Sequence, residues 1–159
     1  MDQMGFKIVG TLHVIVVGQK DPSVADWAEY MKALHAEEKK GIDVTMMRTL
    51  VFSDGGGPNS TMRKQASDLL KGRATPLAIV TGSAMMRGII TALSWFNPEA
   101  RAFSPSNVGE ALQFLQVPTL KFDTIKTTAQ ELRKSLGLRQ VNALEDARLS
   151  GGSGEAARL

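Results

Sequence analysis

The sequence contains no cysteine, few aromatic residues and no long apolar run. Without cysteine there are no disulfides, thiolate metal sites or cysteine nucleophile, and the redox compartment is left undetermined. The longest apolar run, near residues 13–17, is far too short to cross a membrane. The chain does not begin with a basic stretch followed by an apolar one, so we expect no secretory signal. We therefore expect a cytoplasmic protein.

Strong charge of one sign is also missing. The formal net charge is only +3 over 159 residues, and 43% of the chain is hydrophobic, which predicts one domain with a real core. Four basic residues gather around 63–73, but no aromatic residue lies between them. A solvated helix face explains this cluster better than a nucleic-acid site does, so a nucleic-acid partner is not expected.

The hydrophobic pattern predicts strands alternating with helices. The predicted strands are 6–9, 13–17, 42–52, 75–80 and 101–103. The predicted helices are 23–41, 60–71, 83–96, 107–115 and 124–136. This order indicates an α/β fold with a mixed, mostly parallel sheet, helices packed on it and an added C-terminal helix. The strand at 75–80 lacks alternation, which predicts burial on both faces.

The first predicted helix has clear end signals. Ser23 and Asp26 have the spacing of a capping box, and Gly41 is placed to end the helix. Its apolar stripe, expected to be buried, comprises Val24, Trp27, Ala28, Met31, Leu34 and His35. His13 and His35 have no second ligand at metal-binding spacing, so both are predicted to serve packing, and no metal or cofactor is expected.

The order of elements, with the segments Ala78-Ile-Val-Thr-Gly82, Ala100-Arg-Ala-Phe103 and Gly109-Glu-Ala-Leu-Gln-Phe-Leu115, resembles a STAS-type domain. This is the fold of bacterial anti-sigma-factor antagonists and of antagonist-like proteins. The resemblance covers residues 5–116; residues 117–149 would be a C-terminal helical extension, and the glycine- and serine-rich 150–159 a flexible tail.

The resemblance implies a non-catalytic regulatory or scaffolding domain that binds a protein in a bacterial signalling or assembly system. An alternative is a binder of a small ligand or lipid headgroup, because antagonist-like proteins share their topology with CRAL-TRIO proteins. An apolar cavity under the second and third helices would favour that alternative. Regulatory antagonists also carry a phosphorylatable serine in an Asp-Ser-Ser-Gly-like turn. That motif is missing here, where the turn reads Asp54-Gly-Gly-Gly-Pro-Asn-Ser60-Thr61.

The glycine-rich turn before the second helix is nevertheless the most informative segment. It is predicted to offer free backbone N–H groups beside a helix N-terminus, where phosphate binds well. The candidates for a phosphate or switch site are Gly55, Gly56, Gly57, Ser60, Thr61, Arg63 and Lys64. The P-loop pattern fails because Lys64 comes too late, and the dinucleotide pattern fails because Ser60 replaces its third glycine. The competing interpretation is a flexible turn followed by ordinary N-caps.

The helix predicted at 83–96, which Ser83 is placed to cap, has an unusual outer face. Opposite its apolar stripe (Met86, Ile89, Ile90, Leu93 and Phe96), the candidate interface residues are small, with one tryptophan: Ala84, Gly88, Thr91, Ala92 and Trp95. A surface helix should have a polar face, so something should cover this one. The cover would be either the C-terminal helix or a second protein, including a second copy in a homodimer. No nucleophile–base pattern is recognisable, so a catalytic role is not expected.

Overall fold

The computed structural model describes residues 2–93 and 98–138. Within them a five-stranded sheet has the order β1-β2-β3-β4-β5. Its strands are β1 (Met4–Val9), β2 (Leu12–Val17), β3 (Arg48–Ser53), β4 (Leu77–Thr81) and β5 (Ala100–Phe103). β1 and β2 form an antiparallel hairpin, whereas β2 to β5 run parallel. The predicted α/β class with a mixed, mostly parallel sheet is confirmed.

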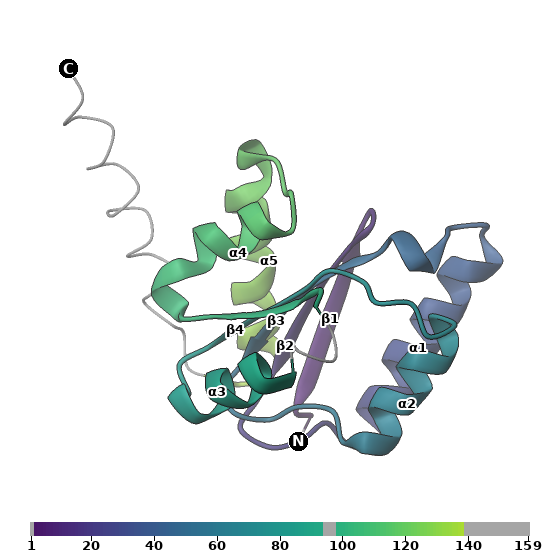
Figure 1. Cartoon of the computed structure of the whole chain (residues 1–159), viewed down its shortest axis with the longest axis horizontal. Helices are drawn as coiled ribbons and strands as arrows, with labels where there is room; N and C mark the ends of the chain where they lie inside the picture. Colours follow the sequence, from purple (N-terminus) through teal and green to yellow (C-terminus); the bar gives the residue numbers. More distant parts are fainter. Residues whose placement is uncertain (1, 94–97, 139–159) are drawn as a thin grey trace.

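Helices cover both faces of this sheet (Figure 1). They are α1 (Val24–Lys39), α2 (Ser60–Leu69), α3 (Ala84–Leu93), α4 (Val108–Phe114) and α5 (Phe122–Ser135), with short 3-10 turns η1 (Val44–Met46), η2 (Pro105–Asn107) and η3 (Thr119–Lys121). α1 and α2 pack on one face and α4 and α5 on the other. α3 lies beside β4 and β5. Throughout the described part of the chain, every helix is too short or too polar to span a bilayer.

The core has two layers, one on each side of the sheet. The layer under α4 and α5 includes Val14, Val16, Leu50, Ala78, Val80, Val108, Leu112, Ile125 and Ala129. The layer under α1 and α2 comprises Met4, Ile15, Val17, Trp27, Tyr30, Leu34, Met47 and Met62. α5 packs against β1 and β2, so it covers these two strands and does not cover α3.

Several local predictions are confirmed. Both hydrogen bonds of the Ser23–Asp26 capping box are present, and Gly41 adopts a left-handed φ of 85° after α1. Ser83 Oγ accepts the Met86 N–H at 3.1 Å at the start of α3. The buried side of α4 (Val108, Ala111 and Leu112, with Leu115 just after the helix) is fully inaccessible to solvent.

Two strand predictions are wrong. The strand expected at 42–52 begins only at Arg48, because the Asp43 carboxylate accepts the Thr45 N–H at 2.9 Å and starts a 3-10 turn. β4 is not covered on both faces. It lies next to the edge strand β5, so Ala78 and Val80 are buried while Leu77 and Ile79 stay half-exposed.

The predicted burial of the α1 stripe is also partly wrong. Trp27 and Leu34 are buried, but Val24 is 81% exposed and His35 and Ala28 are exposed as well. Tyr30 is buried in their place. α1 is therefore turned so that one side of its apolar stripe faces the sheet and the other faces α2.

Candidate functional site

The glycine-rich turn after β3 does not offer the free N–H groups expected of it. The Gly55 N–H donates to Ser53 Oγ at 3.0 Å, and the Gly56 N–H donates to the Gly18 carbonyl at 2.9 Å. The Gly57 N–H donates to Asp21 Oδ1 at 3.1 Å. All three glycine amides are thus occupied by the chain itself, and those of Gly56 and Gly57 tie this turn to the loop that follows β2.

The two basic residues of the predicted phosphate or switch site already have partners within the chain. Asn59, not Ser60, is the N-cap of α2, because its side chain accepts the Met62 N–H at 3.0 Å. Arg63 Nη1 donates to the Pro58 carbonyl at 2.7 Å, and Lys64 pairs with Asp68 at 2.8 Å. Ser60 and Thr61 are exposed in the first turn of α2. Their modification stays a prediction.

One glycine of this turn has no room for a side chain. A Cβ on Gly56 would collide with the Lys20 carbonyl and lie 2.5 Å from its carbon, whereas a Cβ on Gly57 would meet nothing within 4 Å. We expect Gly56→Ala to lower the free energy of unfolding by about 1–3 kcal/mol, because backbone must shift. Gly57→Ala, the matched control, should change it by less than about 0.5 kcal/mol. Urea denaturation measures both; equal effects would contradict the packing described.

A cleft of about 430 Å³ lies at the carboxyl ends of β3 and β4. An ion pair forms one wall: Arg133 of α5 donates from both terminal nitrogens to Asp54, each at 2.9 Å. The Arg133 side chain is 3% exposed and that of Asp54 26% exposed. Ligands of open α/β sheets bind at this edge, so the cleft has the position of a small-molecule site. Its guanidinium, however, is already neutralised by the carboxylate.

The outer face of α3 is open to solvent. Ala84, Gly88, Thr91 and Ala92 are exposed, and α5 packs on β1 and β2 instead of covering them. Met85 and Ile89, beside these small residues, are 77% and 48% exposed. Arg87, the one charged residue of α3, folds back and donates to the Thr81 carbonyl at 2.8 Å. Trp95, the remaining interface candidate, lies outside the described residues.

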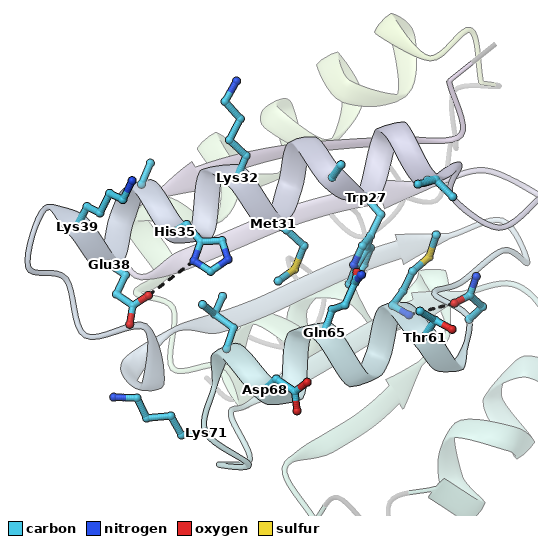
Figure 2. Close-up of a pocket in the computed structure, with 16 residues that line it drawn as sticks. Trp27, Met31, Lys32, His35, Glu38, Lys39, Thr61, Gln65, Asp68 and Lys71 are labelled. Carbon is cyan, nitrogen blue, oxygen red and sulfur yellow. Dashed lines mark hydrogen bonds and ion pairs between the residues drawn. The ribbon is translucent and has the colours of Figure 1, made fainter.

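A groove of about 1200 Å³ lies between α1 and α2 (Figure 2). Trp27 and Met31 point from α1 toward α2, and Gln65 points back from α2. Trp27 is 7% exposed, and its Nε1–H is the one buried side-chain polar atom in the described residues without a hydrogen-bond partner. The hydrophobic pattern of α1 alone does not predict that this indole lacks an acceptor.

Among the described residues, no group of three or more histidine or acidic side chains is placed to hold a metal ion. Comparison with known protein families, curated proteins and solved structures finds no match for this chain. The resemblance to a STAS-type domain therefore stays a prediction.

Proposed function

We propose that this protein is a non-catalytic interaction domain, with a regulatory or scaffolding role in the cytoplasm, that binds protein through the outer face of α3. The observation that carries the proposal is the open apolar stripe of Ala84, Met85, Gly88, Ile89 and Ala92. Exposed helix faces are normally polar, and a contiguous apolar one favours a protein contact.

A second copy of the chain fits this face well. Ala84, Gly88 and Ala92 recur every fourth residue, and such small residues allow two helix backbones to approach closely. Met85 and Ile89 flank the small residues, so each copy could lay its larger side chains over the small stripe of the other. Arg87 is turned toward Thr81, so its charge is directed away from this face and does not oppose such contact.

We expect wild type to be a dimer in light scattering and Gly88→Glu to be a folded monomer. A Cβ at Gly88 meets nothing within 4 Å in one chain, so the variant should fold normally. Gly88→Ala separates the two effects of a side chain at this position. It should stabilise the helix by about 1 kcal/mol, but it should weaken dimerisation about tenfold because the added methyl group moves the two helix backbones apart. Ser67→Glu, on the exposed side of α2, is the matched control. A wild type that stays monomeric at high concentration would contradict self-association through α3.

The second candidate function is binding of a small ligand or lipid headgroup. The cleft at the ends of β3 and β4 favours it, because its volume of about 430 Å³ is within the range of small-molecule sites. The Asp54–Arg133 pair weakens this candidate for phosphorylated headgroups, because the buried cation already has its counter-charge. The interaction function therefore has the stronger support.

A further inference from the structure

The groove between α1 and α2 runs along the whole of α1. Its lining residues recur at helical spacing along this face: Val24, Trp27, Ala28, Met31, Lys32, His35, Ala36, Glu38 and Lys39. α1 has 16 residues, which at 1.5 Å each makes the groove roughly 24 Å long. The facing wall on α2 includes Met62, Gln65 and Leu69. A hollow of about 1200 Å³ exceeds the usual size of a small-molecule pocket.

The chemistry of the groove changes along its length (Figure 2). One end is apolar or neutral, with Val24, Trp27 and Thr61. The other end, where both helices finish, carries His35, Glu38, Lys39, Asp68 and Lys71. Asp68 is already paired with Lys64, and Glu38 lies 3.8 Å from His35. Lys39 and Lys71 form no ion pair among the described residues, so these two lysines are left for anionic groups of an occupant.

The exposed part of the α1 stripe indicates that the groove is built to be filled. The apolar stripe of α1 is wider than the sheet covers, which leaves Val24 81% exposed beside the buried Trp27. Ala28 and Ala36 continue this exposed apolar line along α1, and Met31 between them is half-buried. An occupant of the groove would remove this apolar surface from water.

We propose that this groove binds an amphipathic helix of a protein partner, at a site distinct from the α3 face and independent of it. The apolar side of that helix would pack on Val24, Ala28 and Met31, above the buried Trp27 and Met62; adaptable methionines are typical of helix-binding grooves. Acidic residues at one end of the helix would lie near Lys39 and Lys71.

The test uses the full chain and two synthetic peptides of one composition, about 16 residues long to match α1. In the first, leucines at i, i+3, i+4, i+7 and i+11 form one face, with glutamates at one end. In the second, the same residues are scrambled around the helix. The protein used carries Trp95→Phe, so that Trp27 is its single tryptophan. Binding is then measured as a change in the fluorescence emission of Trp27. We expect the amphipathic peptide to bind at least about tenfold tighter than the scrambled one.

Exposed alanines on α1 supply matched variants. Ala28 and Ala36 line the groove, whereas Ala25 is exposed outside it. Ala28→Arg and Ala36→Arg should each weaken peptide binding about tenfold, and Ala25→Arg should leave it within about twofold. Equal binding of the two peptides, or full binding by both groove variants, would overturn the proposal. So would a Trp27 response to decanoate without one to the peptide, which would assign the groove to an acyl chain. Peptide binding that requires removal of residues 139–159 would assign it to this chain's own C-terminal segment.

Discussion

Asp54→Asn is expected to lower the free energy of unfolding by about 3–5 kcal/mol, the largest single effect we predict. The change strips the counter-charge from Arg133, whose side chain is 3% exposed and cannot move to water without disrupting α5. Removal of one partner of a buried pair costs far more than the pair itself contributes, because the other charge stays buried. Arg133→Met should cost less, since Asp54 is 26% exposed and can be hydrated.

The chain supplies a matched control in its exposed pair. Asp68→Asn makes the same chemical change opposite Lys64, but these side chains are 65% and 75% exposed. It should alter stability by less than about 0.5 kcal/mol. Urea denaturation of the single variants and of Asp54→Asn with Arg133→Met completes a double-mutant cycle. A loss for Asp54→Asn no larger than that for Asp68→Asn would show that burial does not govern this pair.

Local signals in the sequence were sufficient for most of the fold. Capping at Ser23 and Ser83 and left-handed glycine at Gly41 depend on neighbouring residues only, so they could be predicted. The strand predicted from Ile42 failed for a local reason too: Asp43 competes for the backbone at 2.9 Å, which an apolar count does not register.

The sites were harder to predict because they depend on contacts between distant segments. Glycines 55–57 have the composition of a phosphate loop, but Gly18 and Asp21, more than thirty residues earlier, take two of their amides. Arg133 offered a usable signal, since it lies four residues after Ala129 on the buried side of α5. A charged residue at such a position predicts a buried partner, yet only the fold identifies Asp54.

Stability should also fall in mild acid, and His13 is the cause. His13 is 4% exposed on β2, and burial lowers its pKa from 6.5 to about 4, although the nearby Glu37 carboxylate raises it somewhat. Its Nδ1 lies 3.1 Å from the Tyr30 hydroxyl, whose own pKa burial raises above its usual range. Between pH 6.5 and about 4, the unfolded chain therefore binds a proton at this imidazole that the folded chain does not.

It follows that this contribution is complete above pH 6.5 and is lost as the pH falls toward about 4. The full difference in pKa corresponds to about 3 kcal/mol. We expect His13→Leu, which cannot titrate, to lose this part of the pH dependence when urea denaturation is followed across that window. His35→Gln is the control, because His35 is 57% exposed and should leave the wild-type slope unchanged. All other titratable groups are common to both proteins, so the difference between wild type and His13→Leu isolates the imidazole. Identical slopes for those two proteins would mean that the His13 imidazole can be protonated in the folded state, because β2 and α1 separate around it.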